Sequence, residues 1–358
     1  MSSTPFATPP KSLLVVRLGA MGDIIHTLAA VTALRTALPD LRLGWVIEDR
    51  WSELLLARNT PRSGPRTAQR PVADFVHIVD TKRWRKSAFS GETRAKIKSA
   101  LREIRNQNYE LAADFQGALK SALVARLAGA RTVTGFAHPR ELPAHFFYKQ
   151  FVETTDLHVI DQYRRIAEFI AGVALHSGSP QLPHDQDAEA NIAAKMADTK
   201  DFVLINPGAG WGAKQWPAER YGEVAQSLAA GGLLPIINFG PGEEELALKV
   251  QEASCGVAQP ISCSVAELIA LTRRAKLFIG GDTGPLHLAA ALKIPVVAIF
   301  GPTDPARNGP FGTRSIVLRD PASRTSLSHT NSPDPALLNI TAAEVISSAR
   351  RLLETSVA

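Results

Sequence analysis

The stretch from Leu277 to Leu292, LFIGGDTGPLHLAAAL, contains a short apolar run, a glycine-rich turn and a helical pattern in immediate succession. An apolar run that ends in glycines and continues into a helix with proline in its first turn is typical of a buried parallel strand and its connecting helix. The same succession opens the chain, where Ser12–Arg17 leads through Gly19 and Gly22 into a helical pattern. The stretch therefore predicts an α/β protein.

Further apolar runs alternate with helical patterns on both sides of the segment 174–187, which is rich in Ser, Pro, Gly and His. The pattern predicts strands at Ser12–Arg17, Leu43–Ile47, Phe75–Asp80, Leu111–Phe115, Thr132–Phe136, Phe202–Asn206, Leu234–Phe239, Leu277–Gly280 and Val296–Phe300. It predicts helices at Ile24–Leu38, Glu92–Asn106, Ala118–Leu127, Asp161–Ala171 and Ala342–Leu353. We expect two similar α/β domains, residues 1–173 and 188–340, joined by a linker and facing each other across a ligand-binding cleft. The C-terminal helix, within 341–358, is expected to pack back on the first domain.

The composition bounds the class of protein. With 45% hydrophobic and 21% charged residues the chain fits a soluble globular protein, and no apolar run approaches the roughly 20 residues of a membrane-spanning helix. Two cysteines outside any CxxC pair argue against a disulfide framework or a thiolate zinc site, and they fit a reducing cytosol. The start, Met1–Lys11, predicts a loose tail with nothing to pack rather than a signal peptide. The segment Arg58–Arg70 has no apolar period and predicts a mobile loop.

The net charge of +6 is unevenly distributed. Residues 58–131 contain sixteen Lys and Arg against six Asp and Glu, so the rest of the chain is net acidic. A basic field of this size favours an anionic partner such as a nucleic acid, a phosphorylated ligand or an acidic membrane surface. A solvated basic face explains the composition equally well.

The first glycine-rich turn ends in Asp23. A strand-to-helix turn with two glycines lets a ligand approach the backbone, and the helix N-terminus that follows favours anions. Asp23 stands where an N-cap is expected, and a carboxylate at this place could instead act as a general base. His26, three residues later, could pair with it or simply pack. The residues alone leave these alternatives open.

A second glycine-rich loop, Asn206–Pro217 (NPGAGWGAKQWP), follows a predicted strand and contains one lysine, Lys214. Such a loop can offer backbone N–H groups and one ammonium to a phosphate. The alternative is a plain surface loop, which the density of glycine beside an isolated lysine disfavours. After the next strand Glu243 could accept hydrogen bonds from ribose hydroxyls or could belong to an acidic first helical turn. In the Gly-Gly-Asp-Thr-Gly turn, the helix start and His287 could together hold a diphosphate, whereas Asp282 could serve only as a cap.

Taken together, these motifs resemble glycosyltransferase family 9, the lipopolysaccharide heptosyltransferases. The segments that carry the resemblance are RLGAMGDIIHTLAAVTALR, NPGAGWGAKQWP, GGDTGPLHLAAAL and IFGPTDP. Within the family, the run Lys82–Lys86 (KRWRK), together with DFQGALKSA from Asp114 and Arg140-Glu141-Leu142-Pro143, is similar to the branch that adds the first heptose.

The resemblance implies a GT-B fold of two facing Rossmann-like domains and an inverting transfer of L-glycero-D-manno-heptose from ADP-heptose to the 3-deoxy-manno-oct-2-ulosonic acid (Kdo) of lipid A. It implies a catalytic base, Asp23, with Lys214 assisting. The implied donor-binding residues are Gly22, Gly208, Ala209, Gly210, Lys214, Glu243, Asp282, Thr283, Gly284 and His287. The implied acceptor-binding residues are Lys82, Arg83, Arg85, Lys86, Gln116 and Arg140.

No acidic metal cluster such as DxD stands in a suitable loop of the sequence, so we expect no cofactor or metal and assign its task to Lys214 and helix-start N–H groups. The same resemblance implies a cytoplasmic enzyme that associates with the inner face of the cytoplasmic membrane and binds no nucleic acid. The alternatives are a heptosyltransferase of type II or III, a sugar-nucleotide epimerase or hydrolase of GT-B fold, and a non-catalytic anion-binding protein.

Overall fold

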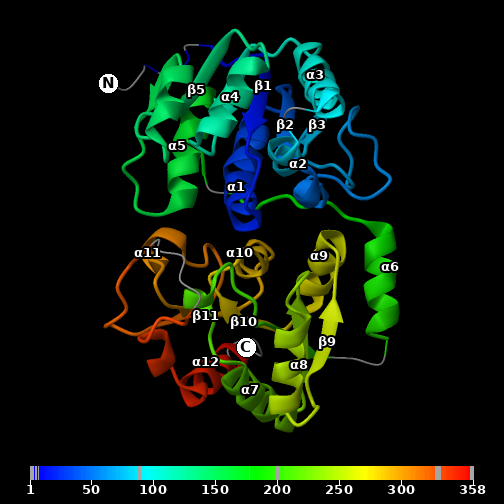
Figure 1. Ribbon diagram of the computed structural model, residues 1–358, viewed down its shortest axis with the longest axis vertical. Coiled ribbons are helices and arrows are strands. Elements are labelled where there is room, and N and C mark those ends of the chain that lie inside the picture. The colour runs from blue at the N-terminus through cyan, green and yellow to red at the C-terminus, as the bar shows by residue number, and fades with distance from the viewer. Residues whose placement is uncertain are drawn as a thin grey trace. The chain divides into compact units, whose positions relative to one another are not determined.

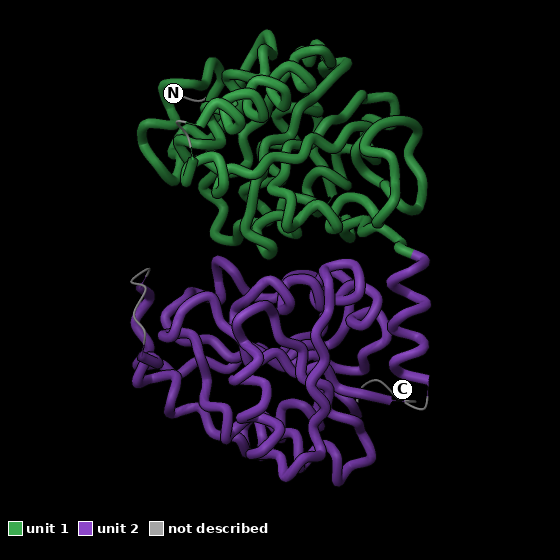
Figure 2. The backbone as a smooth tube through the Cα atoms, turned by 45° about the vertical axis from the view of Figure 1, so that its right-hand side comes forward, with its two compact units in different colours: residues 1–185 green, residues 186–358 purple. Residues whose placement is uncertain are grey.

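The computed structural model describes residues 4, 6, 8–87, 90–176, 178–197, 201–326 and 332–354, so parts of the predicted tail and of the segment 341–358 lie outside the described residues. The chain divides into two compact units, Met1–Asp185 and Gln186–Ala358 (Figure 2). The division falls within the segment 174–187 that we interpreted as the linker. Each unit contains one six-stranded sheet of parallel strands, as the alternating pattern predicts (Figure 1).

The elements of the first unit are β1 (Ser12–Val16), α1 (Met21–Ala37), β2 (Arg42–Glu48), η1 (Asp49–Leu54), β3 (Phe75–Val79), α2 (Thr81–Lys86), α3 (Gly91–Arg105), β4 (Leu111–Asp114), α4 (Leu119–Leu127), β5 (Thr132–Phe136), η2 (Leu142–Phe147), β6 (Gln150–Val152) and α5 (Val159–Ala171). Those of the second unit are α6 (Gln186–Lys195), β7 (Phe202–Asn206), η3 (Gly212–Lys214), α7 (Ala218–Ala230), β8 (Leu234–Phe239), α8 (Glu244–Ala253), β9 (Gln259–Ser262), α9 (Val265–Arg274), β10 (Leu277–Gly281), α10 (Gly284–Ala291), β11 (Val296–Phe300), α11 (Pro305–Asn308), β12 (Ser315–Arg319), η4 (Leu337–Asn339) and α12 (Ala342–Glu354). Every predicted strand is present.

The first sheet has the strand order β3-β2-β1-β4-β5-β6. Its central strand β1 is buried at every position, because helices cover both faces. Residues of α3 and α4 join the apolar cluster on one face, and α1 packs against α5. The second sheet has the order β12-β11-β10-β7-β8-β9, and α7, α8 and α12 contribute to one continuous apolar cluster with alternate residues of its strands. In each unit the connections bring the carboxyl ends of all six strands to one edge of the sheet.

The C-terminal helix departs from the expectation that it packs back on the first domain. Instead, α12 contacts α7 and the strands β10, β11 and β12. Val345, Ala349 and Leu352 are buried in the apolar cluster of the second unit. The apolar stripe of α12 is therefore buried within the second unit, to which the helix itself belongs.

Described residues of two segments that we predicted to be loose contact the rest of the first unit. The tail contains Phe6, whose ring lies edge-on to that of Phe169 with the centroids 5.5 Å apart. In the segment Arg58–Arg70, the guanidinium of the buried Arg70 donates to the carbonyl oxygens of Pro61, Gly64, Pro65 and Ala73. One side chain thus satisfies four loop carbonyls that would otherwise need water. The segment is therefore anchored by polar contacts, which hydrophobic periodicity does not reveal.

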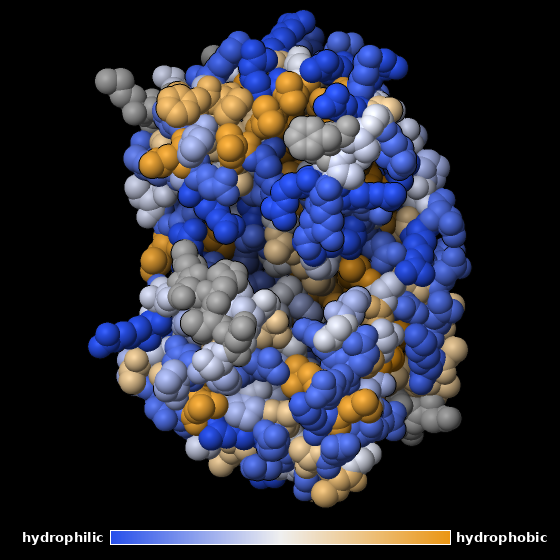
Figure 3. All heavy atoms as spheres, viewed as in Figure 1, coloured by the Kyte–Doolittle hydropathy of each residue, from blue (hydrophilic) through white to orange (hydrophobic). Residues whose placement is uncertain are grey.

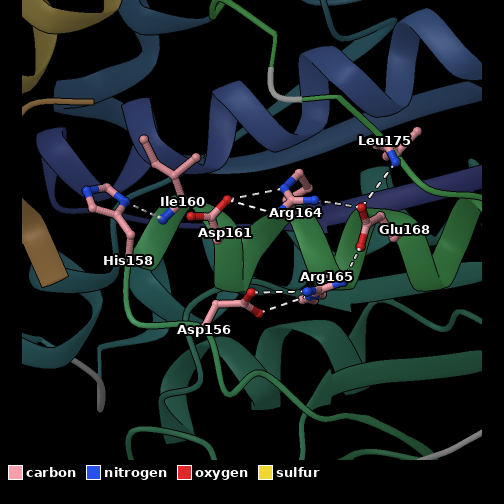
Figure 4. Close-up of polar contacts among 8 residues, drawn as sticks. All are labelled: Asp156, His158, Ile160, Asp161, Arg164, Arg165, Glu168 and Leu175. Atoms are coloured by element: carbon pink, nitrogen blue, oxygen red, sulfur yellow. Dashed lines mark hydrogen bonds and ion pairs between the residues drawn. The ribbon is translucent and has the colours of Figure 1, made fainter. Parts of the chain in front are cut away.

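Helix α5 has a dense set of polar contacts along its exposed side (Figure 4). His158 caps it by accepting a hydrogen bond from the backbone N–H of Ile160 at 3.2 Å. Arg164 pairs with Asp161 and Glu168, and Arg165 pairs with Asp156 and Glu168. Glu168 also accepts a hydrogen bond from Leu175 N, which fixes the chain that leaves the helix.

Two tyrosines of the first unit occupy space that a glycine within a strand leaves open. A Cβ atom added to Gly44 would lie 1.9 Å from the hydroxyl oxygen of Tyr109, and one added to Gly135 would lie 2.4 Å from Cε2 of Tyr148. Each hydroxyl reaches a buried polar group: Tyr109 bonds to His77, and Tyr148 donates to Asp114. Burial raises the pKa of both hydroxyls above the ordinary tyrosine value.

Within the described part of the chain, no helix is both long enough and apolar enough to cross a membrane.

Candidate active site

Asp23 lies in the first turn of α1, directly after the carboxyl end of β1. The N-cap is Ala20, and Asp23 is the third residue of the helix, so its carboxylate caps the helix start from position N3 rather than from the N-cap. Asp23 instead faces back toward the cap, where its carboxylate accepts a hydrogen bond from Ala20 N at 3.4 Å. Its side chain is 38% exposed, which leaves the carboxylate accessible to a ligand. His26 is buried, and its ring lies edge-on to that of His158.

Arg17, the residue after β1, is the ion-pair partner of Asp23. Its guanidinium is buried, forms an ion pair with the Asp23 carboxylate and donates to the carbonyl oxygen of Phe115 at 2.6 Å. Burial alone would lower the pKa of the guanidinium, but Asp23, the Tyr163 hydroxyl and Asp114 together raise it above its ordinary value. A permanently charged donor therefore joins the turn after β1 to the turn after β4.

The turn after β4 contains Gln116 and is built on a buried carboxylate, Asp114. Asp114 accepts hydrogen bonds from the backbone N–H groups of Gln116 and Gly117 and from the hydroxyls of Ser121 and Tyr148. Burial raises the pKa of its carboxyl despite these four donors. The Gln116 side-chain oxygen accepts from Leu18 N at 3.0 Å, so this amide is oriented by the turn after β1.

The remaining acceptor candidates follow β3 and β5. The run after β3 forms a short helix, α2, capped by the Asp80 side chain on Arg83 N, and it exposes all four cations: Lys82, Arg83, Arg85 and Lys86. Arg140 is exposed just before η2, and its backbone N lies 3.1 Å from the place of a Cβ on Gly117. The structure thus gathers Asp23, Gln116, Arg140 and the α2 cations at the carboxyl edge of the first sheet.

In the second unit, Lys214, Asp282 and His287 form one hydrogen-bonded group although they come from three different segments. Nζ of Lys214 lies 2.5 Å from Oδ2 of Asp282 and 3.2 Å from its backbone oxygen, and it lies over the Trp211 ring at 4.2 Å from the centroid. Nε2 of His287 lies 3.1 Å from Oδ1 of the same carboxylate. All three side chains are less than 10% exposed.

The charges of this group favour an ionised Asp282. Burial alone would raise the pKa of its carboxyl, but the hydrogen bond and charge of His287 and the charge of Lys214 hold that pKa well below its ordinary value. The N-cap of α10 is Thr283, not Asp282, and Thr283 forms no side-chain cap. The first backbone N–H groups of α10, starting at Gly284, therefore add donors beside the Lys214 ammonium.

The loop after β7 lies against the turn after β8. A Cβ on Gly208 would fall within 2.3 Å of the Glu243 carboxylate, which accepts a hydrogen bond from Gly240 N at 2.8 Å. Two buried asparagines connect the strand ends beneath them: Asn238 donates to Asn206 at 2.8 Å, and Asn206 donates to Gly208 O. Ala209 and Gly210 follow in the same loop, and the latter is exposed.

The predicted donor residues therefore meet at the carboxyl edge of the second sheet, apart from Gly22, which is buried beside Asp23 in the first unit. The sequence motifs indicate no role for Arg17, Asn206 and Asn238. The signal that could have found them is shared, since each is a polar side chain at or next to the carboxyl end of an otherwise apolar strand. Among the described residues, no three His, Cys, Asp or Glu side chains gather as a metal site.

Comparison with known proteins agrees with this arrangement. The chain is 29% identical over 325 residues to lipopolysaccharide heptosyltransferase 1 of Escherichia coli (strain K12), covering 89% of this chain and 96% of that protein. The solved structure of the E. coli heptosyltransferase WaaC with ADP superimposes with a TM-score of 0.76 at 25% identity, covering 95% of this chain and 99% of that one. WaaC with ADP-2-deoxy-2-fluoro heptose gives a TM-score of 0.73 at the same identity, covering 96% and 99%.

These neighbours have the GT-B fold, to which the two Rossmann-like units of this chain correspond. The sequence model of the family described as glycosyltransferase family 9 (heptosyltransferase) matches residues 97–335, a range that includes Gln116, Arg140 and every donor candidate of the second unit. The chain therefore belongs to glycosyltransferase family 9 and is a glycosyltransferase.

Proposed function

We propose that the enzyme transfers L-glycero-D-manno-heptose from ADP-heptose to the Kdo of the lipid A inner core, with inversion at the anomeric carbon. The observation that carries the proposal is the buried Lys214–Asp282–His287 group at the start of α10, in a chain similar over nearly its whole length to a heptosyltransferase solved with an ADP-heptose analogue. That group presents an ammonium and helix-start N–H groups, which are donors suited to a diphosphate.

Asp23 would act as the general base. As the Kdo hydroxyl oxygen forms its bond to the anomeric carbon, the hydroxyl proton passes to the Asp23 carboxylate. The bond from that carbon to the diphosphate breaks, and its electron pair leaves with ADP. Lys214 and the N-terminus of α10 stabilise the charge that develops on the departing diphosphate, so the proposal assigns this task to the protein and to no metal or cofactor. Glu243 would accept hydrogen bonds from the ribose of the donor.

The α2 cations and Arg140 would hold the anionic groups of the acceptor, with Gln116 oriented beside them. Such an acceptor is anchored in a bilayer, so we propose a cytoplasmic enzyme that works at the inner face of the cytoplasmic membrane and binds no nucleic acid.

The direct test is incubation of the purified protein with ADP-heptose, with and without Kdo-lipid A, followed by mass spectrometry of the lipid and of the free sugar. The proposal expects one heptose on the lipid and ADP release that depends on the acceptor. Free sugar without acceptor would indicate a hydrolase, and an isomerised donor would indicate an epimerase. Transfer only to an acceptor that already carries heptose would indicate a type II or III enzyme. Binding without any turnover would overturn the enzymatic role.

Replacing Lys214 by Ala is expected to weaken ADP binding at least about tenfold, because the diphosphate loses a buried ammonium whose hydrogen bonds to a charged group are worth about 1.5–3 kcal/mol. Isothermal titration with ADP measures this effect. Lys276→Ala removes a lysine of the same unit that is paired with Asp201 on the surface, and it should leave the affinity unchanged. An unchanged ADP affinity in Lys214→Ala, together with a lower thermal midpoint, would mean that Lys214 serves only to neutralise Asp282.

Replacing Arg83 and Arg85 together by Ala is expected to raise the KM for Kdo-lipid A roughly tenfold at low salt and to leave ADP affinity alone. The difference from the wild type should shrink as salt rises, because screening already weakens the wild-type contacts. The matched control, Arg94→Ala with Lys98→Ala, removes the same charge from exposed positions of α3. An unchanged acceptor KM, or an equal effect in the control, would show that the α2 cations form only a solvated basic face and do not bind the acceptor.

A further inference from the structure

The first unit exposes four large apolar side chains on two elements that contact each other, α4 and η2. Leu119 and Leu123 of α4 are each 42% exposed, Leu142 of η2 is 77% exposed, and Phe146 is 87% exposed. We call these four residues the α4–η2 patch. Figure 3 shows apolar residues gathered over α4 on this face of the unit. Clustered exposure of this kind marks an interaction surface, whereas single exposed apolar residues need no explanation.

The exposure is built into the packing of η2. Ala144 and Tyr148 are buried in the apolar cluster that α3 and α4 form with one face of the first sheet, and Phe147 packs against that cluster. These three residues anchor η2 to the core of the first unit, so Leu142 and Phe146 are held on the solvent-facing side of η2.

The stretch of sequence that contains the patch is strongly basic. Between residues 119 and 149 the chain has one acidic residue, Glu141, and its carboxylate is occupied in accepting a hydrogen bond from Leu119 N at 2.8 Å. The same range has five exposed basic residues: Lys120, Arg126, Arg131, Arg140 and Lys149.

We propose that the α4–η2 patch inserts into an anionic phospholipid membrane, with Leu142 and Phe146 entering the acyl boundary and the surrounding cations contacting the headgroups. Apolar side chains beside Lys and Arg are the combination that binds a membrane interface, because burial and headgroup attraction add. A second copy of the chain fits less well, since it would bring one basic rim against another. The proposal rests on the proposed function only for its biological reason, which is access to a lipid-anchored acceptor.

The patch also adjoins the acceptor candidates. Glu141 N donates to Gly117 O at 2.9 Å, which ties the residue before η2 to the turn that holds Gln116. Arg140 belongs to both the patch rim and the acceptor set. A membrane bound at the patch would therefore present its headgroups close to the residues that we assign to Kdo and phosphate.

The test is sedimentation of the full-length protein with sucrose-loaded vesicles of phosphatidylcholine, with or without phosphatidylglycerol, in the absence of donor and acceptor. The wild type is expected to bind the vesicles that contain phosphatidylglycerol. Leu142→Ser with Phe146→Ser is expected to lower the partition coefficient at least about tenfold, because two exposed apolar side chains no longer leave water. Leu248→Ser, at a 53% exposed position of α8 in the second unit, is the matched control and should bind as the wild type does.

A second variant reports insertion directly. Phe146→Trp should show a blue shift of tryptophan fluorescence with these vesicles, and Leu248→Trp should show none. The proposal would be overturned if the wild type failed to bind the vesicles or if the double variant partitioned equally well. It would also be overturned if Phe146→Trp showed no shift. A wild-type dimer that the double variant converts to a monomer in sedimentation velocity without vesicles would overturn it as well, because the patch would then be a subunit interface.

Heptose transfer to Kdo-lipid A dispersed in detergent separates this proposal from the proposed function. A protein that transfers heptose in detergent but ignores vesicles overturns only the membrane patch. A protein that binds vesicles through the patch but transfers nothing overturns only the proposed reaction.

Discussion

Asp23→Asn is expected to lower the turnover of heptose transfer at least about a hundredfold, the usual contribution of a general base. The amide keeps the size of the side chain and can still accept from Ala20 N, but it cannot take the proton of the acceptor hydroxyl. ADP affinity should barely change, because the remaining donor candidates lie in the second unit. Steady-state kinetics with ADP-heptose and Kdo-lipid A, beside titration with ADP, would measure both.

The matched control is Asp49→Asn. Asp49 is exposed in the first turn of η1, directly after the neighbouring strand β2, so it has the same residue type at the same edge of the sheet. It should turn over normally. If Asp23→Asn also retained near-normal turnover but lost thermal stability, its carboxylate would serve only the first turn of α1.

Arg17→Met is expected to reduce turnover at least about tenfold and to lower the free energy of unfolding by about 2 kcal/mol. The stability loss follows from the buried charged hydrogen bond to Phe115 O, of a kind worth about 1.5–3 kcal/mol. The turnover loss follows because Asp23 loses the group that orients it. Thermal unfolding and the same kinetic assay would give the two values.

A conservative variant distinguishes orientation from simple support of the fold. Arg17→Lys can keep the cation beside Asp23, but one ammonium cannot reproduce the planar fork that reaches both Asp23 and Phe115. We expect it to recover most of the turnover while remaining less stable than the wild type. Equal loss of turnover in both variants, in step with stability, would show that Arg17 only supports the turns.

The strands that the sequence pattern missed have a common physical property. β6, β9 and β12 are all edge strands of their sheets. The predicted strands of each sheet's interior are covered on both faces and appear as continuous apolar runs, whereas β9 is exposed or half-buried along its length. An edge strand needs only one neighbour and little burial, so hydrophobic periodicity has little to detect.

The site was predictable residue by residue but not as a set of contacts. Glycines, a lone lysine and the Asp-Thr-Gly turn placed Lys214 and Asp282 at strand ends, because parallel strands deliver their carboxyl ends to one edge. That their side chains pair across 68 positions of sequence required the structure. Arg17 escaped notice for a related reason: a charge at the end of a buried strand becomes informative only when its partners, Asp23 and Phe115, are known to converge on it.

The glycine–tyrosine contacts of the first unit restrict which substitutions its homologues can accept at these positions. Gly44 and Tyr109 are 65 positions apart in the chain, yet a methyl group on the first leaves no room for the ring of the second. A methyl group on Gly135 would clash with the ring of Tyr148 in the same way. A lineage that acquires alanine at either glycine must shrink the matching tyrosine, and it then has to find another hydrogen-bond partner for His77 or Asp114. A homologue that keeps the tyrosine of a pair should therefore also keep its glycine.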